Sequence, residues 1–142
     1  MSEGRDALIA IARDICARAH APYSGIHVGA AIRAASGAVY GGTNVENAAY
    51  PIGNCAEASA IAAGVAAEGT GFRIAETAVW AVDGRGQAIA ISPCGGCRQR
   101  IREFAVDGQV LVHFPWQGAA LRTATVDELL PFAFELPGTH AP

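Results

Sequence analysis

Apolar residues near the N-terminus recur at the spacing of an amphipathic helix. Over residues 4–20, one side of such a helix carries Leu8, Ile11, Ile15 and Ala19. Charged residues lie off that side, as expected for a helix that covers a core. The segment "APYSG" that follows contains Pro and Gly, which end helices. We therefore predict a helix over 4–20 that is closed by a turn.

The rest of the chain alternates between strand and helix patterns. "HVGAAIRAA" and "AVYGGTNVE" flank the turn residues "SG", which predicts a β-hairpin over 27–46. "NAAYPIGN" is predicted as a loop. Further strands are predicted at 73–84, 87–92 and 109–115, and helices at 55–68 and 125–134, the last with Thr125 as its N-cap. Residues 94–105 are predicted as a loop that runs into a further helix. This alternation predicts an α/β domain with helices on both faces of a sheet.

Composition narrows the class of protein. The 142 residues fit one domain spanning 1–142. Charged residues make up 16% of the chain, against about 25% in an average soluble domain, so part of the surface is expected to be buried in a homo-oligomer. The net charge of −3 and the pI near 5.7 argue against a nucleic-acid partner held through phosphates.

The N-terminal segment and the cysteines indicate a compartment. Charges interrupt the apolar stretch of the first 24 residues, so we expect neither a signal peptide nor a membrane span. Four cysteines in a chain without a secretory signal favour the cytoplasm, reduced thiols and a metal site.

The segment "SPCGGCRQRIREF" places a C-x-x-C pair on a Gly-rich turn before a predicted helix. Alone, this pair is compatible with half of a structural zinc site, with a redox pair or with two packed thiols. The other cysteines are Cys16 and Cys55. Cys16 lies on the apolar side of the first helix and is interpreted as a core thiol.

Three candidate ligands remain, Cys55, Cys94 and Cys97. Three protein ligands with a fourth position for water are typical of a catalytic zinc. Both ligand segments begin helices, whose unpaired N–H groups stabilise thiolates. Glu57 follows Cys55 closely enough to exchange protons with a water at the metal. The pattern C-A-E … P-C-x-x-C is the three-cysteine form of the zinc-deaminase signature.

The chain resembles the small homotetrameric cytidine deaminases through "APYSGIHVGAAI", "TNVENAAYP", "NCAEASAI", "SPCGGCRQRIREF" and "TVDELLPFAF". The resemblance implies a three-layer α/β/α sandwich with a mixed five-stranded sheet. It also implies one Zn²⁺ per chain on Cys55, Cys94 and Cys97, with Glu57 moving protons. The implied reaction is hydrolytic deamination of cytidine or deoxycytidine in pyrimidine salvage.

The same resemblance assigns residues to the substrate, a cytosine nucleoside. Asn44 and Glu46 match residues that hold a ribose hydroxyl, and an amide with a carboxylate suits a sugar diol. A turn at the end of the hairpin is the alternative role for this pair. The backbone of Ala56 is implied to contact the pyrimidine edge. Tyr50 and Phe134 match aromatic residues that reach a neighbouring subunit's pocket, with plain interface packing as the alternative.

Two positions depart from the family pattern. The family often has Arg where Ala58 stands, and that Arg offsets thiolate charge; zinc with three thiolates carries a net charge of −1. Arg98 and Arg100 are candidates to replace it, although we expect them on a solvated helix face. Ile26 stands where the family usually has Phe against the base. The next residue, His27, is expected at the surface.

Three other functions fit part of the pattern. A related hydrolase would act on N4-substituted cytidines or on a blasticidin-type antibiotic, and "NVENAAYP" favours ribonucleosides over the antibiotic. A non-catalytic zinc module would need a fourth protein ligand, but the histidines do not have ligand spacing to the cysteines; these are His20, His27, His113 and His140. A nucleic-acid editing deaminase is disfavoured by the acidic pI.

Overall fold

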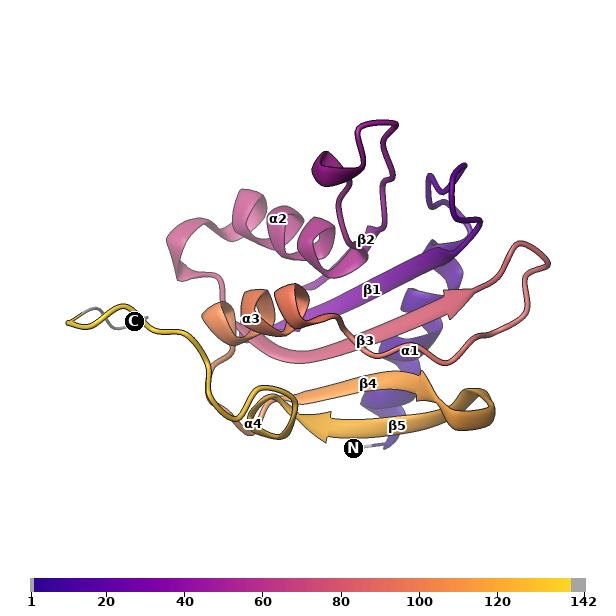
Figure 1. The fold of residues 1–142 in the computed structure, drawn as a ribbon. Coiled ribbons are helices and arrows are strands. Elements are labelled where there is room, and N and C mark those ends of the chain that lie inside the picture. The colour runs from indigo at the N-terminus through magenta and orange to yellow at the C-terminus, as the bar shows by residue number, and fades with distance from the viewer. Residues whose placement is uncertain (1, 139–142) are drawn as a thin grey trace.

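One mixed sheet carries helices on both faces, in the strand order β2-β1-β3-β4-β5 (Figure 1). The computed structural model describes residues 2–138. β3 and β4 are parallel, and the other neighbouring strands are antiparallel. The strands are β1 (His27–Ala34), β2 (Val39–Thr43), β3 (Ile74–Val82), β4 (Leu111–Trp116) and β5 (Ala120–Thr125), and the helices are α1 (Ser2–Cys16), α2 (Ala56–Glu68), α3 (Gly95–Phe104) and α4 (Val126–Leu129). The predicted three-layer α/β/α architecture is confirmed.

Each face of the sheet has its own apolar core. α1 covers one face and packs Leu8 and Ala12 against Ala78 and Trp80 of β3. α2 and α3 lie together on the opposite face (Figure 1), over a larger core that includes Ile32, Phe72, Ile74, Ile101 and Val112. Cys16 is buried on the α1 side, and its thiol donates to the Arg13 carbonyl over 3.0 Å. Cys16 is therefore a core thiol, as predicted.

The elements differ from the prediction in three places. The first helix ends at Cys16 rather than at residue 20. Residues 87–92 form no strand, although β5, which the sequence analysis missed, restores the number to five. The C-terminal helix stops at Leu129, and Pro131 follows shortly. Thr125 is its N-cap, as predicted, within a capping box with Glu128.

Residues 87–92 form a connecting segment instead of the predicted strand. β3 and β4 pair only from Glu76 to Ala78 on β3, and beyond this point they separate. The Ile89 N–H then donates to the Ala81 carbonyl over 3.1 Å, and the Ile91 N–H donates to the Pro115 carbonyl over 2.8 Å. The segment thus lies between β3 and β4 and leads the chain to Cys94.

A glycine fixes where α2 lies on the sheet. A Cβ on Gly42 of β2 would lie 2.3 Å from the Ala60 nitrogen and 2.6 Å from the Ala56 carbonyl oxygen, both in the backbone of α2. Such distances are far inside van der Waals contact, so only glycine permits this approach. The contact places the first turn of α2, with Cys55 and Glu57, directly against β2.

A buried polar chain crosses the sheet on the α1 side. His113 forms two hydrogen bonds, from Nδ1 to Thr123 Oγ1 at 2.7 Å and from Nε2 to Glu76 Oε2 at 2.6 Å. Glu76 also forms an ion pair with Arg33. Burial lowers the pKa of His113, although the hydrogen bond to Glu76 opposes this shift. His113 is therefore neutral in the folded protein near pH 7.

This network predicts how stability depends on pH. Because the pKa of His113 is lower in the folded state, the unfolded chain takes up the proton more readily. The contribution of neutral His113 to the free energy of unfolding is present above about pH 6.5, the ordinary histidine pKa. This contribution is lost as the pH falls towards the pKa of His113 in the folded state. Urea unfolding at saturating zinc from pH 7.5 to 5 should show this loss. We expect His113→Gln to reduce this loss of stability with falling pH and the exposed control His20→Gln to retain it. An equal pH dependence of the free energy of unfolding in all three proteins would contradict the prediction.

None of the helices in the part of the chain that the structure describes has the length and apolar character of a membrane span.

Candidate metal centre and substrate pocket

Two helix starts bring three cysteines together. Cys55 is the N-cap of α2, Cys94 is the N-cap of α3, and Cys97 lies in the first turn of α3. Their sulfur atoms all lie within 4.8 Å of one another. Cys97 is buried, Cys55 is half-buried and Cys94 is exposed, so the group opens to one side.

The donor set fits zinc. Thiolates are soft ligands, and three of them with one open side match a zinc site that keeps a position for water. Hydrogen bonding from Cys97 lowers the pKa of Cys55 to about 6, and the same shared bond raises the pKa of Cys97. Thiols that share protons at this distance can release those protons when they bind one metal cation.

Glu57 is buried beside the cysteines in the first turn of α2, with 4% of its surface exposed. Burial raises its pKa, and the negative charge of Cys55 adds to the shift. A carboxyl group with a raised pKa is better matched to accepting and returning a proton near neutral pH. The position therefore suits a general acid–base residue rather than a solvated one.

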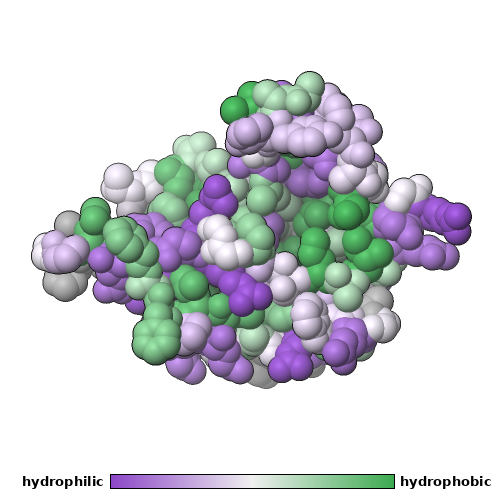
Figure 2. Space-filling model, viewed as in Figure 1, coloured by the Kyte–Doolittle hydropathy of each residue, from purple (hydrophilic) through white to green (hydrophobic). Residues whose placement is uncertain are grey.

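A cavity of about 420 Å³ opens above the cysteines. Figure 2 shows apolar side chains gathered in a hollow below the loop that carries the short 3-10 helix Tyr50–Ile52. The apolar wall of the cavity is formed by Ile26, Val28, Val79 and Ile91. Cys55, Ala56, Glu57 and Cys94 line it as well, and its other polar residues include Asn44, Glu46 and Ser92. The cavity thus joins the metal centre to most of the predicted substrate residues.

Asn44 holds the start of β1 in place. Its Oδ1 accepts from the Val28 N–H over 2.8 Å, and its Nδ2 donates to the Ile26 carbonyl over 2.8 Å. One amide hydrogen remains for a ligand. Asn44 therefore has a structural role at the end of the hairpin, and this role coexists with a place in the cavity wall.

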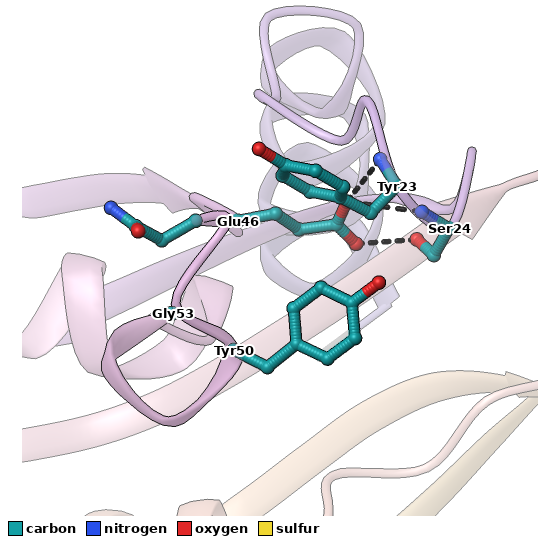
Figure 3. A pocket seen from close by; sticks show the side chains of 6 residues that line it. Tyr23, Ser24, Glu46, Tyr50 and Gly53 are labelled. Atoms are coloured by element: carbon teal, nitrogen blue, oxygen red, sulfur yellow. Dashed lines mark hydrogen bonds between the residues drawn. The ribbon is translucent and has the colours of Figure 1, made fainter.

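Glu46 is held by the turn that follows α1 (Figure 3). Its carboxylate accepts from the backbone N–H groups of Tyr23 and Ser24 over 2.9 and 3.1 Å, and from the Ser24 hydroxyl. Donation by Ser24 lowers the pKa of Glu46 and keeps it ionised. The Ser24 hydroxyl also accepts from the Ile26 N–H over 3.0 Å, so Ser24 connects two residues of the cavity wall.

A second cavity of about 320 Å³ adjoins the first and shares Ser24, Glu46 and Gly53 with it. Tyr23 and Tyr50 flank it, with their rings edge to face at 5.7 Å between centroids (Figure 3). Tyr50 is 73% exposed. Phe134, at 69% exposed, lies outside both cavities of this chain, and Gln99 fixes its backbone through two hydrogen bonds of 3.0 and 3.1 Å.

Arg98 is half-buried rather than on a solvated face, whereas Arg100 is exposed, as expected. Arg98 donates to the carbonyls of Pro93 and Leu129 over 2.8 and 2.9 Å and to the Ser92 hydroxyl over 3.1 Å. It thereby fixes the turn before Cys94. Arg100 instead reaches a ligand, with Nη1 3.7 Å from Cys97 Sγ.

The histidines also differ from a simple surface pattern. His27 is half-buried rather than at the surface, and its Nδ1 is buried without a hydrogen-bond partner. His113 belongs to the polar chain across the sheet, and His20 is exposed. The grouping with the three cysteines includes none of these described histidines. His140 lies outside the described residues.

Sequence reasoning missed Ser24 and Gln99. Ser24 was read only as part of a helix-ending turn, and its partner Glu46 lies 22 residues away. Gln99 belongs to no motif, and its contact with Phe134 joins residues 35 positions apart. The helical spacing of three residues between Cys97 and Arg100 was a usable signal for their contact.

Comparison with known proteins decides the family. Residues 2–113 match the family model described as the cytidine and deoxycytidylate deaminase zinc-binding region. The chain belongs to the cytidine and deoxycytidylate deaminase family. Within it, a cytidine deaminase of Sporosarcina psychrophila is 39% identical over 127 residues, which cover 89% of this chain and 88% of the relative.

Solved structures of cytidine deaminases agree with the fold. The cytidine deaminase of Burkholderia pseudomallei superposes with a TM-score of 0.78 at 36% identity, covering 91% of this chain and 98% of that one. The Mycobacterium tuberculosis enzyme gives a TM-score of 0.73 at 34% identity, covering 93% and 98%. The family match and the cysteine geometry together assign a zinc ion to this deaminase, consistent with one per chain.

Proposed function

We propose that this chain is a cytidine deaminase that hydrolyses cytidine or deoxycytidine to uridine or deoxyuridine in pyrimidine salvage. The observation that carries the proposal is that Cys55, Cys94 and the buried Glu57 line one cavity, while the sulfurs of Cys55, Cys94 and Cys97 lie within 4.8 Å of one another. This arrangement supplies a metal site at the starts of α2 and α3 and a proton carrier in the first turn of α2, which is what a hydrolytic deaminase requires.

Cys55, Cys94 and Cys97 would hold the zinc, which when bound supplies a nucleophilic water at neutral pH. Glu57 accepts a proton from the attacking water and delivers it to N3 of the base as the oxygen adds to C4. Glu57 then takes the proton of the hydroxyl group that was added to C4 and delivers it to the exocyclic nitrogen. The C4–N bond breaks, a carbonyl forms at C4, and the nitrogen leaves as ammonia. Its raised pKa suits both transfers because the carboxyl group must hold a proton between them.

The cavity wall would orient the nucleoside. The N–H of Ala56 has no acceptor within α2, because it lies in the first turn, and it is free to bond the pyrimidine edge. Asn44 and the ionised Glu46 would hold a ribose hydroxyl with the groups that their structural bonds leave unused. Ile26 would pack against the base from the rim of the cavity.

A substrate panel tests this function. The ultraviolet spectrum of cytidine and deoxycytidine should change from that of a cytosine to that of a uracil nucleoside, with release of one ammonia per uridine or deoxyuridine formed. N4-acetylcytidine tests the hydrolase of modified cytosines, because Ile26 is smaller than the Phe usual in the family. Single-stranded RNA tests the editing alternative and should stay unchanged. Turnover of the acetylated or polymeric substrate without turnover of either nucleoside would overturn the proposal.

We further propose that the protein is a cytoplasmic homotetramer formed by the single domain of residues 1–142. Low charge content and the exposed aromatic rings of Tyr50 and Phe134 support assembly. Phe134 lies on a segment that Gln99 holds in place, so its ring is available to complete a neighbouring chain's pocket.

Sedimentation velocity at micromolar concentration tests the assembly. We expect a species of four chains, because the exposed aromatic surface is costly to leave in water. Phe134→Ala should shift the distribution towards smaller species and raise KM, whereas Phe104→Ala, in the core, should lower stability instead. A fully active monomer would exclude a pocket that neighbours complete.

A further inference from the structure

The metal centre of this chain has an excess of negative charge. Zinc with three thiolates carries a net charge of −1, and Glu57 adds another when it is ionised. Cys97 and Glu57 are buried, so water screens this charge poorly. Residue 58, next to Glu57 on α2, is Ala and contributes no charge. A cation close to the sulfurs would make the centre far less costly to form.

Arg100 is placed to be that cation. It lies three residues after Cys97 on α3, and helical side chains lean towards the N-terminus of their helix, so it folds back over the cysteine turn. Its Nη1 lies 3.7 Å from Cys97 Sγ. A Cβ on Gly96 would lie 3.2 Å from the same Nη1 and 4.0 Å from Cys94 Sγ. Gly96 therefore leaves the space through which the guanidinium reaches Cys97.

The neighbouring arginines of α3 are committed elsewhere. All three nitrogens of Arg98 donate to oxygens, those of Pro93, Leu129 and Ser92. Arg102 pairs with Glu135 over 2.9 Å, on the C-terminal segment. Arg100 is thus the arginine of this helix whose contact is a metal ligand.

We propose that Arg100 provides the counter-charge of the zinc–thiolate centre, as a positioning residue that acts through Cys97. Its positive charge offsets the negative charge of the sulfurs around the ion and lowers the tendency of the centre to lose metal. Groups of this kind, which contact a ligand but not the metal, typically change metal affinity about 10–100-fold when removed. The inference rests on the zinc site and not on the identity of the nucleoside.

The test is zinc affinity, measured by competition with a chromophoric chelator at fixed pH and low salt. Arg100→Gln keeps the length and hydrogen-bonding capacity but removes the charge, and we expect its Kd for zinc to rise about 10–100-fold. Arg100→Lys keeps the charge and should lie between Gln and native. Arg102→Gln removes one charge from the same helix without touching a ligand and should bind like the native protein.

Two results would overturn the role of Arg100. One is native zinc affinity in Arg100→Gln. The other is equal weakening of zinc binding in a control variant: in Arg102→Gln it would show a net-charge effect, and in Arg100→Lys it would show a packing effect. Thermal melts of the zinc-free proteins should coincide, and a lower melting temperature of Arg100→Gln would mean a structural role instead. A native protein that binds zinc in this pattern but leaves cytidine intact would overturn the proposed function and not this inference.

Discussion

Glu57→Gln is expected to retain the fold and the zinc but to lose most of its turnover. The amide has nearly the shape of the carboxyl group and lies in the same buried turn, so packing is preserved. It cannot accept the proton of the attacking water. General acid–base residues contribute roughly 10²–10⁴-fold in rate, and a group that makes two transfers should be at the upper end. Single-turnover kinetics with metal analysis on the same sample would measure both properties.

Glu68→Gln is the matched control for this variant. Glu68 lies at the other end of α2, where it accepts hydrogen bonds from Ser36 and Tyr40, away from the cavity. We expect a modest loss of stability and native turnover. Turnover of Glu57→Gln within a few-fold of the native rate would end the mechanism proposed for this residue.

Cys55→Ala should remove both metal and activity. Loss of one of three thiolates leaves too few ligands, so the content should fall from about one zinc per chain to a small fraction. Metal analysis after gel filtration would measure the ratio. The change should also cost turnover by at least the factor expected for Glu57→Gln, since the nucleophile is lost with the metal.

Cys16→Ala separates this effect from a general sensitivity to thiol loss. Cys16 is buried under α1, on the opposite face of the sheet, and its thiol bonds to the Arg13 carbonyl. The variant should keep one zinc per chain and near-native turnover. Retention of zinc in Cys55→Ala together with its loss in Cys16→Ala would show that the ligands are misassigned.

Local patterns explain why most of the fold was predictable. The helices and the first four strands follow from apolar spacing and from Gly and Pro at their ends. The fifth strand, Ala120–Thr125, was missed because half of its side chains are exposed and it lacks a clear apolar alternation. Residues 87–92 have that alternation, but the separation of β3 from β4, a tertiary feature, makes them a connecting segment.

The residues of the site likewise include some that local sequence spacing predicts and others that it does not. The cysteines and Glu57 could be found because their chemistry is encoded in spacings of two and three residues. The contacts of Glu46 with Ser24 and of Arg98 with Leu129 could not, because they join residues 22 and 31 positions apart. Arg100 is a candidate from the sequence, but its contact with Cys97 could be seen only once the direction of its side chain was known.

The contact between Gly42 and the backbone of α2 restricts how this enzyme can evolve. A side chain at position 42 would push the start of α2 outward, and Cys55 and Glu57 would move with it. Selection for activity therefore acts on a residue that touches neither metal nor nucleoside. In a lineage under neutral drift, exposed positions of α2 such as Ala62 and Ala66 are free to vary. Position 42, which lies on β2 against the buried side of the same helix, is expected to remain glycine.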